Sequence, residues 1–274
     1  MAPRREPWTA GLRWSAGGLL GLALLALLAP WISPLDPNHI DVLLRYSPPG
    51  PDHWLGCDEL GRDVLSRMLV GARVSLGVGF VAALGTTLVG ALIGAVAGYL
   101  GGRADALLMR GADVLMSIPK IYLVLTLIVV LNPGIRNVVL VIIATEWTGM
   151  ARLVRGEVLS LREREFVLAA RASGAGPGRV LLRHVLPNAM APVYVALTFG
   201  VAGAILMESG LSFLGLGVQP PNASWGSLLS SGRDALAEAP WLVLFPGLAI
   251  FAVLLLVNHV GESLRRRFDP KEAA

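Results

Sequence analysis

The sequence predicts an all-α membrane protein with about six transmembrane helices, and two observations support this. Of its 274 residues, 54% are hydrophobic and only 15% are charged, whereas ordinary soluble domains carry about 25% charged residues. Charged residues are also absent from three long runs, 14–35, 74–102 and 185–207, which have 22, 29 and 23 residues. Because roughly 20 apolar residues in a helix cross a bilayer core, each run can span it. These features exclude a water-soluble enzyme.

The gaps between charged residues place the six spans at 14–33, 74–100, 115–135, 137–155, 188–215 and 240–260. The first is a Leu/Ala-rich run that continues through Ile32, so we expect residues 1–29 to be a membrane anchor rather than a cleaved signal peptide. The fourth span carries Glu146, and only nine uncharged residues precede that carboxylate.

Two connections, 34–63 and 216–239, are rich in Pro, Gly and Asp and are predicted to form ordered turns with short helices. In the first, Asp63 precedes apolar residues at 64, 65, 68 and 69, a spacing typical of a short helix that rests its apolar side on membrane or protein. Asp63 suits the N-terminus of that helix. In the second, Trp225 and Trp241 are predicted to be interfacial aromatic residues. Either connection could be a simple anchor or a contact surface.

The cationic residues predict the orientation in the membrane. Alternate connections carry 17 and 6 of the 23 Lys and Arg residues. By the positive-inside rule, both termini and the connection between the fourth and fifth spans face the cytoplasm. The net charge of +4 is therefore explained by the Lys and Arg residues expected on the cytoplasmic side. Nucleic-acid binding is not expected, because no basic patch alternates with aromatic residues.

The uncharged run 74–102, which contains the second span, carries four glycines spaced by four residues: Gly90, Gly94, Gly98 and Gly102. This spacing puts them on one helical stripe, where a missing side chain lets another backbone approach closely. We expect a packing face there, directed at this chain or at a partner.

Catalytic, cofactor and metal sites are not expected in this chain. It has one cysteine, Cys57, and four scattered histidines, without the H-E-x-x-H or G-x-S-x-G motifs. The segment most similar to a phosphate-binding P-loop is GAGPGR at 174–179, but it lacks the Lys-Ser/Thr ending and a preceding strand.

Three carboxylates at membrane depth are candidate functional residues, because charge there is costly. For Asp113, one turn from Arg110, a hydrogen bond near the cytoplasmic edge is the favoured interpretation. Glu146 and Glu208 could face an aqueous pathway. A proton-coupled transporter would use such residues, so that class stays open.

Residues 162–187 predict a helix–turn–helix elbow in the cytoplasm. The first helix is expected to end at Gly174 in a left-handed cap. Pro177 can start the second helix, and Pro187 interrupts it before the fifth span. Phe166, Ala169, Ala170 and Ser173 share one helix face, which could seat in the groove of another protein or pack on this chain's own helices.

The elbow resembles the cytoplasmic EAA loop of ABC importer permeases, in which E-A-A, three residues and Gly are followed by nine residues and I-x-L-P. The positions that match this pattern are Leu168, Ala169, Ala170, Gly174, His184, Leu186 and Pro187. Leu168 replaces the acidic residue and His184 the isoleucine. Glu165, one turn earlier, could serve in place of the acidic residue.

The resemblance extends in family order over most of residues 53–260, to the C-type permease subunit of dipeptide, oligopeptide and nickel importers. It is carried by HWLGCDELGRDVLSR at 53–67, GARVSL at 71–76, ARLVR at 151–155, ESGLSFLGLGVQPP at 208–221, SWG at 224–226 and FPGLAI at 245–250. Cys57 stands where the family usually has Thr.

This resemblance implies the transmembrane domain of a type I ABC importer in a bacterial or archaeal inner membrane. The expected division is a first helix and extracytoplasmic segment at 1–72, the transmembrane domain at 73–262 with its coupling loop at about 156–187, and a cytoplasmic tail at 263–274. The expected partners are the lipid bilayer, a second homologous permease, an extracytoplasmic substrate-binding protein and two ATPase subunits, which would bind ATP and Mg²⁺.

In that assembly, residues 166–174 would be the coupling helix, and the connections at 34–63 and 216–239 would meet the binding protein. Glu208 and Ser209, near Gly210, would be helix-packing or gate residues. Peptides and nickel are the cargo classes that the resemblance allows. The alternatives are a secondary transporter that uses Glu146 and Glu208, and a membrane scaffold that carries no solute.

Overall fold

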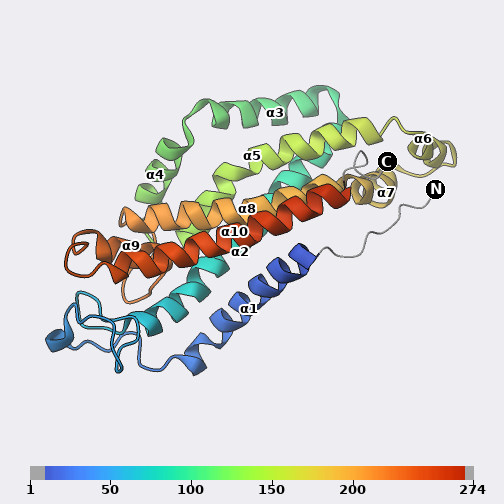
Figure 1. Cartoon of the computed structure of the whole chain (residues 1–274). Helices are drawn as coiled ribbons and strands as arrows, with labels where there is room; N and C mark the ends of the chain where they lie inside the picture. The colour runs from blue at the N-terminus through green and yellow to red at the C-terminus, as the bar shows by residue number, and fades with distance from the viewer. Residues whose placement is uncertain (1–9, 269–274) are drawn as a thin grey trace.

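The computed structural model describes residues 10–268, and its regular elements in that range are all helices. Five lengths of helix are long and apolar enough to cross a membrane. They lie side by side as a bundle (Figure 1). The main helices of the bundle are α1 (Ala10–Ile32), α2 (Val64–Leu100), α5 (Ile135–Leu161), α8 (Met190–Phe213) and α10 (Trp241–Phe268). Part of the predicted tail, 269–274, lies outside the described residues.

The two ends of the bundle carry different elements (Figure 1). The start of α1 and the end of α10 lie at the same end as α6 (Glu165–Ala172) and α7 (Pro177–Val180). The opposite end carries α9 (Trp225–Arg233) and the 34–63 segment, with the 3-10 turn η1 (Val42–Leu44). This arrangement agrees with the topology that the cationic residues predict.

The third predicted span, 115–135, is not one continuous helix, although the two helices found there are together long and apolar enough to span a membrane. The chain forms α3 (Gly102–Ser117) and α4 (Lys120–Leu131), bent by 90° at the break between them. Pro119 explains the break, because the residue before a proline is pushed out of the helical region. Ile118 accordingly has φ −92° and ψ 128°.

The short helix predicted after Asp63 is also not a separate element. Residues 64–69 are the first turns of α2, which continues unbroken for 37 residues. Asp63 is its N-cap, and its carboxylate accepts a hydrogen bond from the Ser66 amide at 2.8 Å. The predicted position of Asp63 at a helix start is therefore correct, while the length of the helix is not.

Helix α2 lies along α5, and glycines set their separation. A Cβ atom at Gly90 would come within 2.7 Å of the Trp147 carbonyl oxygen, and one at Gly98 within 2.9 Å of the Arg155 carbonyl oxygen. Gly94 similarly abuts the backbone of Ala151. Gly102 does not belong to this face, because α2 ends at Leu100 and a Cβ at Gly102 would meet nothing within 4 Å.

The extracytoplasmic end is held by buried polar contacts. Asp58 is fully buried and pairs with Arg62 at 2.7 Å and with Arg67 at 3.3 Å. Trp225 was expected at the membrane interface, but only 2% of it is exposed. Its indole Nε1 donates a hydrogen bond to the Met68 carbonyl oxygen at 3.2 Å, which fixes α9 against α2.

Candidate functional site

The predicted elbow is present in the structure. Gly174 has φ +82°, and the Ala175 amide donates a hydrogen bond to the Ala170 carbonyl oxygen at 3.1 Å, so α6 ends in a left-handed cap as predicted. Pro177 is the first residue of α7. The chain then forms a π turn, η2 (Leu181–Val185), and a 3-10 turn, η3 (Leu186–Ala189), which contains Pro187, before α8 begins.

One side of α6 faces the bundle and the other is open. Val167 is fully buried and belongs to the same apolar cluster as Val158 of α5 and Val180 of α7. Ala170 packs against this cluster, whereas Phe166 is 43% and Leu168 51% exposed. The remaining predicted coupling residues are exposed or half-buried: Glu165, Ala169, Gly174, His184, Leu186 and Pro187.

Of the two roles that the sequence leaves open for this helix, the structure shows packing of one face on the chain's own helices. Val167, which the sequence pattern did not single out, anchors α6 to the chain's own helices. The local sequence contains no distinct signal for it, because its neighbours Phe166 and Leu168 are apolar as well. Phe166 and Leu168 are exposed on either side of Val167, at the end of the molecule (Figure 1).

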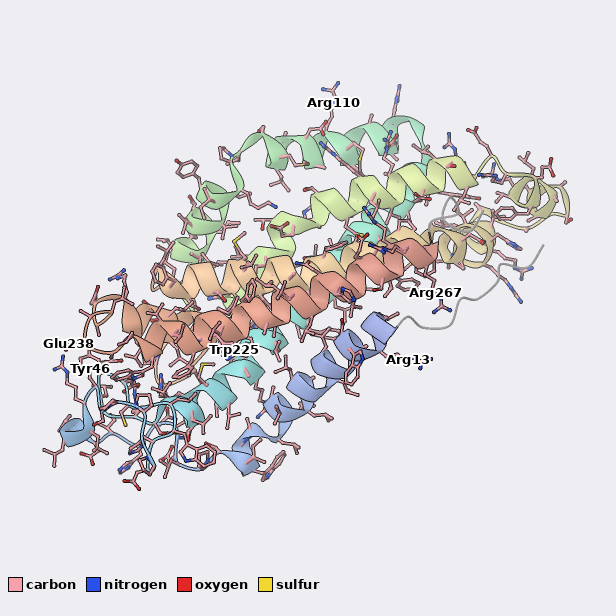
Figure 2. All side chains as sticks on the ribbon, in the orientation of Figure 1. Arg13, Tyr46, Arg110, Trp225, Glu238 and Arg267 are labelled. Carbon is pink, nitrogen blue, oxygen red and sulfur yellow. The ribbon has the colours of Figure 1, made fainter. Side chains whose placement is uncertain are left out.

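Three ion pairs join α3 and α4 to α5. Arg155 contacts Asp105 with two hydrogen bonds of 2.5 and 2.7 Å. Arg152 contacts Asp113 at 2.5 Å, and Lys120 contacts Glu146 at 2.8 Å. The sequence suggested Arg110 as a neighbour of Asp113, but Figure 2 shows Arg110 directed away from the bundle. We refer to these three pairs as the α3–α5 seam.

The 17 Lys and Arg residues assigned above to the cytoplasmic side include Lys120, and the structure does not fit that assignment. Lys120 is the first residue of α4, after the bend, and its partner Glu146 lies 11 residues into the 27-residue helix α5. A rise of 1.5 Å per residue puts Glu146 near the middle of that helix. Pro119 was the available signal, because a proline within a predicted span marks a break.

The Lys120–Glu146 pair lines a cavity of about 650 Å³ between α2, α4, α5 and α8. Within the described residues, these two side chains are the charged groups of its lining. The rest is mainly apolar or small, with Thr86 and Thr87 as polar exceptions. The hydroxyl of Thr86 is buried and has no hydrogen-bond partner among the described residues.

Glu208 lies in a different environment from Glu146. It is fully buried, and its carboxylate accepts hydrogen bonds from Ser75 of α2 at 3.0 Å and from Ser212 at 2.7 Å. The Ser75 hydroxyl in turn accepts a hydrogen bond from the Trp225 amide at 3.1 Å. Glu208 thus connects α2, α8 and α9, and the structure does not bring it into the cavity with Glu146.

Ser209 lies beside this network. It is buried, and its hydroxyl has no hydrogen-bond partner among the described residues. Gly226 of α9 packs so closely on it that a Cβ there would lie 2.7 Å from the Ser209 carbonyl oxygen. Ser209 therefore sits at a tight contact between α8 and α9.

Comparisons with known proteins agree with this architecture. Residues 90–273 match the family model described as binding-protein-dependent transport system inner membrane component. A putative peptide transport system permease protein of Brucella suis is 45% identical over 253 residues, covering 92% of this chain and 85% of that protein. The oligopeptide transport system permease protein OppC of Bacillus subtilis is 42% identical over 250 residues, covering 91% and 82%.

A solved structure shows the same fold. One chain of the inward-facing MetNI methionine ABC transporter superposes with a TM-score of 0.56 at 17% identity, covering 73% of this chain and 95% of that one. The multi-pass helical bundle and the sequence matches agree on one class of inner-membrane transport subunit. The chain therefore belongs to the binding-protein-dependent transport system inner membrane components, the permease subunits of type I ABC importers.

Proposed function

We propose that this chain forms half of the translocation pathway of an ATP-driven peptide importer and that α6 is its coupling helix. As a member of its family the chain is a transport subunit rather than an enzyme, and it works with ATPase and substrate-binding partners. Peptides are the proposed cargo because the Brucella and Bacillus relatives are named as peptide and oligopeptide permeases. Their bacterial origin supports a bacterial inner membrane as the location.

The observation that carries the coupling role is that α6 is buried on one face and exposed on the other. Val167 fixes the helix to the bundle, while Phe166 and Leu168 remain open at the end of the molecule. An aromatic anchor beside small residues suits insertion into a groove of another protein. Because Val167 packs with α5 and α7, a force applied to Phe166 would be transmitted to the bundle.

We propose that the full assembly contains a second, homologous permease and two ATPase subunits that bind ATP and Mg²⁺. ATP binding would close the ATPases, draw the coupling helices together and shift the permeases from inward-open to outward-open. This requires that the closed ATPase dimer bind one permease state more tightly than the other. The 34–63 segment and α9, at the opposite end, would receive the binding protein.

A secondary transporter built on Glu146 and Glu208 is not favoured. Glu146 is paired with Lys120, and Glu208 is held by Ser75 and Ser212. The two carboxylates therefore do not form a shared proton path in this structure.

The coupling role is tested with Phe166→Asp and a matched Phe166→Leu variant in the assembled transporter. Phe166→Asp places a charge in the proposed contact, so uptake and substrate-stimulated ATP hydrolysis are expected to be lost while the chain remains inserted in the membrane. Phe166→Leu keeps an apolar anchor and is expected to retain most activity. Normal uptake by Phe166→Asp would overturn the assignment.

A further inference from the structure

We propose that Lys120 and Glu146 bind the substrate directly and form a site for the two charged ends of a short zwitterionic peptide. The Glu146 carboxylate would accept a hydrogen bond from the ammonium group of the peptide, and the Lys120 ammonium would donate one to the peptide carboxylate. This inference rests on the proposed function, since the peptide cargo comes from it.

The cavity that contains the pair has the size and lining of a small-molecule site. Its volume of about 650 Å³ falls within the roughly 300–1,000 Å³ typical of ligand pockets. Such pockets combine an apolar lining with a few converging polar groups. Here these groups are Lys120 and Glu146.

Glu146 lies near the middle of the membrane-spanning helix α5 and Lys120 contacts it there, where charge needs a specific environment. Charges near the middle of a spanning helix face a protein interior or a water-filled path, since exposing them to lipid is costly. The side chains of Lys120 and Glu146 remain 52% and 30% exposed, and both line the cavity. By contrast, the Arg62–Asp58 pair at the extracytoplasmic end is 8% and 0% exposed. The Lys120–Glu146 pair is thus open to a ligand, whereas the Arg62–Asp58 pair is sealed.

The pair can also change partners at low cost. Partly exposed ion pairs contribute little to stability. The other two pairs of the seam, Asp105–Arg155 and Asp113–Arg152, would still join α3 to α5 if Lys120 and Glu146 separated. Helix α4 also stays on α5 without this pair, because buried apolar side chains of the two helices belong to one cluster.

Charge balance selects the class of ligand. A zwitterion that enters the pair supplies a new partner to each side chain at once, so neither charge is left uncompensated at membrane depth. A peptide blocked at either end would leave one of the two side chains without a partner, which is unfavourable. A dipeptide can reach both groups, because two extended residues span roughly 7 Å.

The experiment uses the assembled transporter in lipid nanodiscs and a reporter cysteine, Gly149→Cys. Gly149 lines the cavity, and a Cβ there would meet nothing within 4 Å. Native Cys57 is fully buried, so the reporter is the thiol expected to react with a maleimide. The labelling rate is measured with free dialanine, and with its N-acetylated, C-amidated form as the matched probe.

Free dialanine is expected to slow labelling about tenfold at saturation, and the blocked form is expected to leave the rate unchanged. Lys120→Gln or Glu146→Gln should raise the half-protecting concentration at least about tenfold, the factor that 1.4 kcal/mol produces. Asp113→Asn removes a seam charge that does not line the cavity, and protection should persist. Recovery of all subunits in the purified nanodiscs checks that each variant is assembled.

Several results would overturn the proposal. Equal protection by the blocked dipeptide, or unchanged protection in both Gln variants, would show that the pair does not bind the peptide ends. A reporter that is labelled in the isolated chain but not in the assembly would show that the second permease fills the cavity. ATP-driven dialanine uptake with no protection would reject this site and leave the proposed function standing. Failure of uptake for every peptide would reject both.

Discussion

The carboxylate of Glu208 in α8 accepts a hydrogen bond from the Ser75 hydroxyl in α2, 133 residues earlier in the chain, at 3.0 Å. The same hydroxyl accepts a hydrogen bond from the Trp225 amide at 3.1 Å. One small side chain therefore connects two helices of the bundle with the extracytoplasmic helix α9.

Replacing Ser75 by Ala is expected to lower the stability of the chain. Both the Glu208 carboxylate and the Trp225 amide would lose a buried partner, and each buried unsatisfied group costs about 1–3 kcal/mol. Thermal unfolding in detergent measures the effect. Ser230→Ala is the control, because its hydroxyl makes one exposed hydrogen bond to the Phe213 carbonyl oxygen. Equal melting temperatures for both variants would contradict this role of Ser75.

Gly94→Ala is expected to push α2 away from α5. The added methyl group would meet the Ala151 backbone, which cannot move aside as a flexible side chain can. Overpacking of this kind costs about 1–3 kcal/mol. Gly111→Ala in α3 is the matched substitution, because its Cβ meets nothing within 4 Å, and it is expected to be neutral or slightly stabilising. A melting temperature lowered only in Gly94→Ala would support the packing face.

Gly174→Asp is expected to uncouple ATP hydrolysis from uptake without preventing insertion. Its φ of +82° is unfavourable for a residue with a side chain, so the turn between α6 and α7 would shift. Gly178→Asp serves as the control, since Gly178 lies inside α7 without a positive φ. The ratio of peptide imported to ATP hydrolysed is the measurement. An unchanged ratio in Gly174→Asp would argue against the importance of this turn.

Cys57 is expected to be unreactive in the folded chain. Burial, followed by the negative charges of Asp63, Asp58 and Asp41, raises the pKa of its thiol to about 11. A maleimide at pH 8 should therefore label the protein only after unfolding in detergent, since the thiolate is the nucleophile. Rapid labelling of the native protein would show that the 34–63 segment opens.

The same thiol predicts a pH dependence of stability. The unfolded thiol has the ordinary pKa of about 9, so unfolding releases its proton between about pH 9 and pH 11. The stability that the neutral, buried thiol contributes to the folded chain is fully present below pH 9 and is lost as the pH rises toward 11. Cys57→Ser should remove it, so the wild-type and variant melting temperatures should converge or cross in that window.

Much of the fold follows from the sequence, because long uncharged runs leave few alternatives to membrane helices. The first, second, fifth and sixth predicted spans overlap α1, α2, α8 and α10. The fourth, in spite of Glu146, is the 27-residue helix α5. The elbow could also be predicted from the sequence, because Gly174 and Pro177 act through local backbone geometry.

The contacts between helices could not be predicted in the same way. Nothing in the local pattern shows that Asp113 would pair with Arg152 or Lys120 with Glu146, because these partners lie 39 and 26 residues apart. Trp225 was misplaced for the same reason, since its burial depends on how α9 folds back onto α2. The bend at Pro119 had a local signal, but the orientation of α4 after it depends on packing.

The central claim, that this chain is half of an ATP-driven peptide importer, is tested most directly by uptake into proteoliposomes. Labelled dialanine is supplied with the binding protein outside, and the assembly of both permeases and the ATPases is compared with this chain alone. We expect uptake that requires ATP inside and every subunit, and that a proton gradient cannot replace. Uptake by this chain alone, driven by a proton gradient, would contradict the account.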